Sequence, residues 1–366
     1  VADESINSKS RVHAALRRKP TDRVPIWMWY HPETVQTIAD VLEIPPEHVA
    51  EAMGDDIRQA WVGNNYAMEG IVHERDGETH TDPWGIEWVK EGPFNQIRYS
   101  PLQNADEESI LSYQYPYDHI DDLLKNMDPV MQTSQEFFVG ADVSPCLYEM
   151  TWRIRGMEET TIELVASPDL ARTMLKQAGA FSLALSKAAC DRFDLDWLWT
   201  GDDVGGQQGM IMSPRCWRDM IRPLLADIFE VGKSRGLWVA YHSCGAIRPI
   251  IPDLIEIGLD VLNPVQCNCP GMDPLELKEE FGSELAFMGG VDTQGLLPTG
   301  TAEEVYRETR RLVEGMTMDG GGYILAASHA IPPETPVENI FAMYDAAGVT
   351  QEETFDCAAD IRGQSK

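Results

Sequence analysis

The chain has 366 residues, of which 43% are hydrophobic, so it can bury a large core and is not expected to be disordered. Its 60 acidic residues outnumber its 29 basic residues and give a net charge of −31 at pH 7. This charge repels phosphate backbones and anionic lipids, so it disfavours nucleic-acid and membrane partners. No stretch approaches the roughly 18 uninterrupted apolar residues that a transmembrane helix needs.

The first residues of the sequence, Val1–Ser5, are polar and acidic and lack the apolar region of a signal peptide. We therefore expect a cytoplasmic protein. The seven cysteines are odd in number and scattered along the chain, which argues against a disulfide framework.

Short apolar segments alternate with helical patterns. The apolar segments predict these strands: Val24–Tyr30, Ile57–Val62, Phe137–Ser144, Leu195–Thr200, Trp238–Ser243, Val261–Val265, Leu285–Gly290 and Gly322–Ser328. Start signals predict three helices: Pro168–Arg192 after a Ser167 cap, Ser213–Arg235 with a Ser-Pro start, and Thr301–Met316 with a Thr-Ala-Glu-Glu start. Buried strands alternating with helices indicate a parallel sheet covered on both faces. The pattern predicts an α/β protein, with residues 1–366 forming a single (β/α)8 TIM barrel.

One segment, 69–132, does not follow this alternation. It holds two stretches of alternating residues, Ile86–Val89 and Gln96–Tyr99, followed by a polar stretch with several prolines. We interpret it as an insertion in the N-terminal half of the barrel: a small hairpin or β-cap followed by a helix and a loop.

In parallel barrels the reacting groups lie at the C-terminal ends of the strands. His242 and Cys244 end one predicted strand, and their spacing of two places both side chains on one face. An imidazole and a thiolate suit zinc, and a third ligand would leave the fourth position for substrate or water. His329, which ends the last predicted strand, is the first choice; Glu149, Asp292, Cys267 and Cys269 are reserves. Packing in the core is the alternative for this pair.

Asp202 and Asp203 end another predicted strand and precede a glycine-rich loop, Val204–Gly209. One carboxylate is expected to bind the loop backbone, and the other to bind substrate or act as a general acid or base. Glu149 is a further proton-transfer candidate. The loop lacks both glycine-rich nucleotide-binding patterns, so we reject a nucleotide site.

Further residues near strand ends are candidates for binding substrate. Asp292 follows two glycines that let backbone approach a ligand, although a loop hydrogen bond explains it equally well. Gln208 lies in the glycine-rich loop. Aromatic residues at the expected mouth are candidates for an apolar cavity wall, or for ordinary packing: Trp29, Tyr148 and Trp152.

Several stretches together resemble the uroporphyrinogen decarboxylase superfamily, over nearly the whole chain outside the insertion. They are Lys19–Pro25, Leu195–Asp203, Met212–Pro214 with Pro223, Trp238–Gly245, Met288–Gln294 and Ser328–Asn339. The resemblance implies the barrel fold and suggests a homodimer.

The superfamily has two branches. The haem-pathway decarboxylase carries arginines in its first-strand motif for the acidic groups of its substrate, whereas Ile26–Pro32 contains no arginine here. The other branch comprises zinc methyltransferases that work with a corrinoid, with a His-x-Cys motif and a third ligand, usually cysteine, near the last strand. His242 and Cys244 match that motif, and His329 stands where cysteine is usual.

The resemblance therefore favours a zinc methyltransferase that moves a methyl group between a small methylated ether, amine or thiol and a corrinoid (a cobalamin) on a separate protein. Zinc is the implied cofactor and the corrinoid protein the implied partner. One alternative is a metal-independent lyase acting on a smaller acid. The other is a non-catalytic protein that binds a corrinoid or tetrapyrrole.

Overall fold

The computed structural model describes residues 6–64, 75–92 and 94–364. It divides into two compact units, each described by itself. Unit 1 comprises Val1–Arg58, Thr133–Val139 and Val261–Lys366, and unit 2 comprises Gln59–Gln132 and Gly140–Asp260. The polar start at Val1–Ser5 and the first part of the predicted insertion, 69–74, lie outside the described residues. Within those ranges, no helix is long and apolar enough to cross a membrane.

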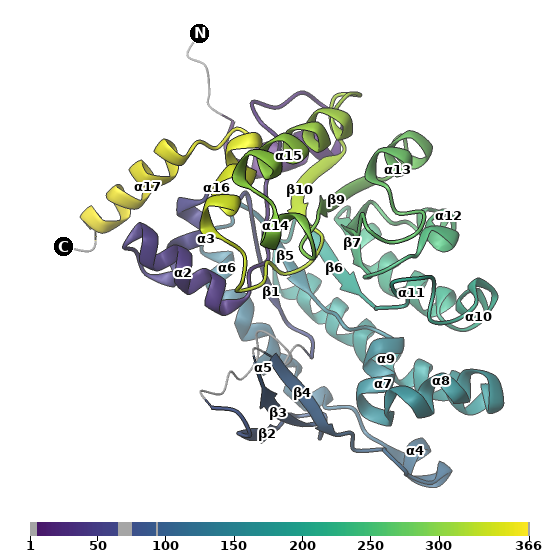
Figure 1. Ribbon diagram of the computed structural model, residues 1–366. Helices are drawn as coiled ribbons and strands as arrows, with labels where there is room; N and C mark the ends of the chain where they lie inside the picture. The colour runs from purple at the N-terminus through teal and green to yellow at the C-terminus, as the bar shows by residue number, and fades with distance from the viewer. Residues whose placement is uncertain (1–5, 65–74, 93, 365–366) are drawn as a thin grey trace. The chain divides into compact units, whose positions relative to one another are not determined.

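The strands β5, β6 and β7 are parallel, as predicted (Figure 1). β5 (Phe138–Asp142) pairs with β6 (Trp197–Gly201), and β6 pairs with β7 (Trp238–His242). β1 (Ile57–Trp61) precedes them in the chain, and the N–H of Val62 donates to the carbonyl of Asp142 at 2.8 Å. Every residue of β5 and β6 is buried, which is typical of parallel strands covered on both faces.

Helices follow these strands in unit 2. Their bounds are α4 (Glu107–Ser112), η2 (Tyr117–His119), α5 (Ile120–Leu123), η3 (Leu124–Met127), α6 (Asp128–Met131), α7 (Tyr148–Arg155), α8 (Met157–Ala166), α9 (Pro168–Arg192), α10 (Pro214–Met220), α11 (Arg222–Lys233), η4 (Arg248–Ile250) and α12 (Ile251–Glu256). The predicted helix bounds hold for α9, although the Ser167 side chain makes no capping hydrogen bond.

The described part of the predicted insertion contains a separate antiparallel sheet. Its strands are β2 (Thr79–Thr81), β3 (Glu87–Glu91) and β4 (Phe94–Tyr99), paired in the order β2-β3-β4. Asp82 anchors it, because its carboxylate accepts hydrogen bonds from the Trp88 indole at 2.8 Å and from the Asn64 amide at 2.7 Å. That the segment is an insertion in a barrel stays a prediction.

Unit 1 repeats the alternation of parallel strands and helices. β8 (Val261–Val265) pairs with β9 (Ala286–Val291), and β9 pairs with β10 (Tyr323–Ala327). Its helices are α1 (Ser8–Leu16), α2 (Pro32–Leu42), η1 (Pro46–His48), α3 (Val49–Ala52), α13 (Pro274–Phe281), α14 (Leu296–Thr299), α15 (Ala302–Met316), α16 (Val337–Ala346) and α17 (Gln351–Gln364). The Thr301–Glu304 capping box starts α15, as its sequence predicts. The chain therefore has a mixed α/β fold with parallel strands.

The prediction of a continuous strand at Val24–Tyr30 is wrong. Only two isolated parallel bridges form there, Ile26 with Leu325 and Tyr30 with Ile331. Two of the other backbone N–H groups donate to buried carboxylates: the N–H of Ile26 to Asp56 at 2.8 Å and that of Met28 to Asp55 at 3.3 Å. At these two positions a side chain accepts the hydrogen bond that a neighbouring strand would accept in a regular sheet.

The predicted helix Ser213–Arg235 is two helices, α10 and α11, which meet at Ile221. Pro223 lacks the N–H that would continue the hydrogen-bond pattern, and Ile221 has φ −100°. The Ser-Pro start is confirmed, since the Ser213 hydroxyl accepts from the Cys216 N–H at 3.2 Å.

Candidate metal centre

The C-terminal end of β7 carries the two candidate ligands that the sequence singled out. His242 is the last residue of the strand, and Cys244 follows two positions later. The Cys244 Sγ lies 3.5 Å from the His242 Nε2. The two side chains therefore lie together at one strand end, as zinc binding requires.

Asp203 joins them from the end of β6. The three side chains offer nitrogen, sulfur and oxygen atoms that all lie within 4.8 Å of one another. The Asp203 Oδ1 lies 3.8 Å from the His242 Nε2 and accepts a hydrogen bond from the Cys244 N–H at 2.8 Å. The sequence analysis gave Asp203 a proton-transfer role and did not consider it as a candidate ligand. The pairing of β6 with β7, which brings it beside His242, is visible only in the structure.

The spacing of these atoms fits a tetrahedral zinc ion. With zinc bonds of about 2.05 Å to nitrogen and about 2.3 Å to sulfur, a tetrahedral angle separates the two atoms by about 3.6 Å. The observed separation between sulfur and nitrogen is 3.5 Å. A carboxylate oxygen is a usual zinc ligand too. The His242 and Asp203 side chains are 17% and 37% exposed, so a small molecule has access.

Two glycines allow the loops after β6 and β7 to meet closely. A Cβ at Gly205 would lie 2.4 Å from the Cys244 carbonyl, and one at Gly245 would lie 2.5 Å from the Gly205 backbone. Only glycine fits such approaches. The Ala246 N–H then donates to the Gly206 carbonyl at 3.0 Å. The glycine-rich loop thus holds Cys244 beside Asp203.

Asp202 is fully buried and its carboxylate caps the start of α7. Its two oxygens accept from the N–H groups of Tyr148 and Glu149 at 2.9 and 2.6 Å. Burial raises the pKa of Asp202 to about 7, although these two hydrogen bonds favour its ionised form. The contacts give Asp202 a positioning role at α7, and its predicted part in proton transfer stays a prediction.

The predicted residues on α7 are differently placed. Glu149 forms an ion pair with Arg153 at 2.6 Å, so its charge is already balanced. The Tyr148 ring is buried and its hydroxyl bonds the Thr161 hydroxyl at 2.8 Å, while Trp152 is half-buried. Packing explains Tyr148 without a substrate.

Of the remaining candidates, Gln208 is exposed in the loop of unit 2, and the other three belong to unit 1. His329 is exposed two positions after the end of β10, and its ring lies against Trp29 with 4.8 Å between centroids. The Asp292 carboxylate accepts from the N–H groups of Gln294, Gly295 and Leu296 at 2.9–3.2 Å. These loop hydrogen bonds are the alternative that the sequence left open for Asp292.

The reserve ligands Cys267 and Cys269 also lie in unit 1. Burial and, to a smaller extent, the nearby Asp292 charge raise the pKa of the Cys267 thiol to about 11. Asp203, His242 and Cys244 form the single close group of three such ligands within the described ranges. Cys267 and Cys269 therefore do not belong to this group of candidate metal ligands.

Comparison with known proteins identifies the family. The uroporphyrinogen decarboxylase (URO-D) family model matches residues 138–348. The chain belongs to this family. A methyltransferase from Methanosarcina mazei has a similar structure, with a TM-score of 0.67 at 19% identity over 93% of this chain and 98% of that one. At this identity the likeness shows a shared fold.

Curated relatives of this family member come from both branches. Methylcobamide:CoM methyltransferase of Methanosarcina barkeri is 23% identical over 354 residues, 92% of this chain and 96% of that protein. Uroporphyrinogen decarboxylase of Roseiflexus sp. is 22% identical over 360 residues, 90% of this chain and 95% of that protein. The methylated-thiol–coenzyme M methyltransferase of Methanosarcina mazei is 21% identical over 217 residues, and this match spans 54% of its length. The predicted resemblance to the methyltransferase branch is confirmed.

Proposed function

We propose that the chain is a zinc-dependent methyltransferase that moves a methyl group between a small methylated substrate and a corrinoid carried by a partner protein. The substrate class is a methyl ether, amine or thiol. The observation that carries the proposal is the group of Asp203, His242 and Cys244, whose ligand atoms lie within 4.8 Å of one another. Methyltransferases among the family relatives support it.

Asp203 and His329 are the two candidates for the third ligand beside His242 and Cys244. Three protein ligands leave the fourth position for the substrate heteroatom, the arrangement of catalytic zinc sites. When bound, zinc would act as a Lewis acid on the heteroatom that carries the methyl group.

The chain's own residues would orient the substrate and handle the proton. If His329 completes the ligand set, the Asp203 carboxylate is free to hold a proton beside the His242 ring. Asp202 would fix the start of α7, and Glu149 would act only after leaving Arg153. The substrate wall predicted at Trp29, Tyr148 and Trp152 and the polar contacts predicted at Asp292 and Gln208 stay proposals, although packing alone accounts for the buried Tyr148 ring.

Paired arginines disfavour the decarboxylase alternative. The carboxylate of Asp56 binds Arg23 at 2.7 Å, and Glu163 binds Arg155 at 2.8 Å. Arg153 is bound to Glu149 in the same way. A polyanionic porphyrinogen needs unpaired cations to hold its carboxylates. A lyase for a smaller acid and a corrinoid-binding protein without turnover remain the competing functions.

We further propose a closed (β/α)8 barrel with an insertion at 69–132, a homodimer and a cytoplasmic location. The parallel pairing of β5 to β7 and of β8 to β10 supports the barrel. The corrinoid protein is the partner.

The test is methyl transfer itself. Protein loaded with zinc is mixed with cob(I)alamin and a panel of methylated ethers, amines and thiols, and methylcob(III)alamin is followed by its absorbance. The reverse reaction starts from methylcob(III)alamin and unmethylated acceptors. We expect turnover in the wild type and in Cys216→Ala, a matched cysteine control on α10, and none in Cys244→Ala. Release of CO2 from a small acid without zinc would support the lyase, and a coloured complex without turnover the binding protein.

A further inference from the structure

A further polar side chain stands beside the candidate metal centre, just after β5. Ser144 follows this strand by two positions and is half-buried. A Cβ at Gly201, the last residue of β6, would lie 2.8 Å from the Ser144 Cβ, 3.4 Å from its Oγ and 3.3 Å from the His242 Cβ. Glycine at this position therefore leaves the Ser144 hydroxyl and the His242 side chain over the same stretch of bare backbone.

The proton of the Ser144 hydroxyl points to a buried carboxylate. The hydroxyl donates to the Asp142 Oδ1 at 2.5 Å, and the Ser144 N–H donates to the same oxygen at 2.8 Å. Asp142 itself is fully buried. A hydrogen bond to an ionised carboxylate is shorter and stronger than one between neutral groups, so it fixes the direction of the hydroxyl.

The Ser144 oxygen can accept one more hydrogen bond. A hydroxyl has one donor and two acceptor lone pairs. The Trp61 indole N–H occupies one lone pair at 3.3 Å, and within the described part of the chain no donor reaches the other. Since the hydroxyl proton is already bound to Asp142, Ser144 can accept a hydrogen bond from a bound molecule but not donate one. A substrate group that suits this oxygen carries a hydrogen of its own, as a thiol does.

The neighbouring carboxylates of unit 2 are already engaged. Asp203 is a candidate metal ligand, and both oxygens of Asp202 accept from N–H groups at the start of α7. Glu149 pairs with Arg153 at 2.6 Å. Asp142 differs from all three carboxylates, because a hydroxyl connects it to the space beside the metal centre.

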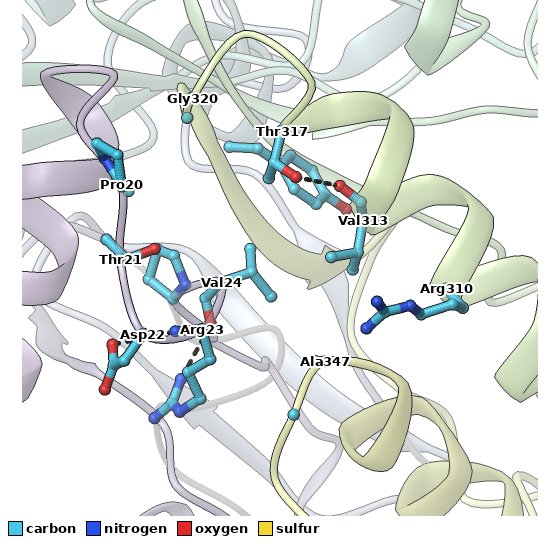
Figure 2. A pocket seen from close by; sticks show the side chains of 15 residues that line it. Pro20, Thr21, Asp22, Arg23, Val24, Arg310, Val313, Thr317, Gly320 and Ala347 are labelled. Atoms are coloured by element: carbon cyan, nitrogen blue, oxygen red, sulfur yellow. Dashed lines mark hydrogen bonds between the residues drawn. The ribbon is translucent and has the colours of Figure 1, made fainter.

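A cavity in unit 1 offers no comparable group. Figure 2 shows it between the Pro20–Val24 segment and the end of α15, with a volume of about 350 Å³. Two of its polar side chains already have partners, since Arg23 binds Asp56 at 2.7 Å and the Thr317 hydroxyl donates to the Val313 carbonyl at 2.7 Å. This cavity therefore carries no proposal of its own.

We propose that Ser144 and Asp142 form a proton relay for the methyl-transfer substrate, an inference that rests on the proposed function. When a thiol acceptor binds at the metal centre, its S–H bond breaks and the sulfur keeps the electron pair. The Ser144 oxygen takes the proton of the thiol while its own proton passes to the Asp142 carboxylate.

The proton balance of the reaction follows from this path. The thiolate attacks the methyl group of a methyl-corrinoid, and the electron pair of the broken carbon–cobalt bond stays on the cobalt, which becomes Co(I). In the opposite direction, the Co(I) corrinoid removes the methyl group from the substrate. Asp142 then returns its proton through Ser144 to the heteroatom that has lost its methyl group.

Proton release on thiol binding tests the relay without any turnover. Full-length protein loaded with Co(II) in place of zinc is mixed with 1-propanethiol, without oxygen, at about pH 7, where a free thiol keeps its proton. The sulfur-to-cobalt charge-transfer band counts the bound thiolate, and a pH indicator in weakly buffered solution counts the released protons. In the wild type the proton should stay on Asp142, because this carboxylate is buried. Ser144→Ala and Asp142→Asn should show the same band and release about one proton per bound thiolate.

Matched variants at exposed positions serve as controls. Asp227→Asn on α11 and Ser234→Ala directly after it should behave as the wild type. The band itself shows that a site variant still folds and binds the thiolate. Release of the proton by the wild type, or its retention in either site variant, would overturn the relay alone. No band in the wild type would also overturn the inference, whereas the proposed function fails only if the methyl-transfer assay shows no turnover.

Discussion

Replacing Asp56 by alanine should destabilise the protein strongly, because this carboxylate is fully buried between two arginines. Its oxygens accept from Arg11 at 2.6 Å, from Arg23 at 2.7 and 3.1 Å and from the Ile26 N–H at 2.8 Å. The arginine side chains are 10% and 16% exposed. Alanine would leave Arg23 without this carboxylate in a poorly solvated place, while Arg11 keeps Asp22.

The expected loss follows from burial rather than from distance. Removing one partner of a buried ion pair costs about 3–5 kcal/mol, because the other charge stays buried without compensation. The exposed pair of Asp122 and Lys125 has the same 2.6 Å separation, but both side chains are 65% exposed. An exposed pair contributes little because water screens both charges, so Asp122→Ala is a matched control.

Equilibrium unfolding in urea measures both variants. Both the midpoint and the slope of the unfolding transition are compared between each variant and the wild type, because a chain with two compact units need not unfold in one step. We expect a large drop in midpoint for Asp56→Ala and almost none for Asp122→Ala. Equal shifts for the two variants would refute the reasoning that burial sets the energy of these pairs.

Three further predictions concern a titration, a packing contact and a ligand. Burial raises the pKa of Asp55 to about 7, so between about pH 4 and 7 the folded state keeps a proton that the unfolded chain has lost. The free energy of unfolding should therefore fall as the pH rises through this range. Asp55→Asn should make this fall smaller, as measured by urea unfolding at several pH values. Gly140→Ala would place a Cβ 1.8 Å from the Trp197 ring and should lower the melting temperature in calorimetry, whereas Gly363→Ala, with open space around it, should not. Asp203→Asn and His329→Ala should differ in zinc affinity, which competition with a chelating dye measures. The variant with the larger loss of zinc affinity identifies the third ligand. If both variants keep the wild-type affinity, neither residue is a ligand.

Much of the fold could be predicted where a local signal and the tertiary structure agree. α9 and β8 have the predicted bounds, and the capping box sets the start of α15. α9 and α15 have helix start signals in the sequence, and β8 is a short, mostly apolar segment.

The failures come from partners distant in sequence. Val24–Tyr30 has the composition of a strand, but Asp55 and Asp56 take its N–H groups, which no local pattern shows. The break at Ile221 has a local signal, since Pro223 has no N–H to continue the helix. At the candidate site, the spacing of His242 and Cys244 predicted that the two side chains lie together, whereas the nearness of Asp203 follows from the pairing of β6 with β7, which the sequence does not show.

Metal content by mass spectrometry decides whether Asp203, His242 and Cys244 lie at a zinc site. The protein is purified without a metal-affinity step, beside His242→Ala, Cys244→Ala and the matched surface variants His119→Ala and Cys216→Ala. We expect about one zinc per chain in the wild type and both surface variants, and almost none in the two site variants. If the wild type holds no zinc even after incubation with it, or if both site variants keep the wild-type zinc content, these residues do not form a zinc site.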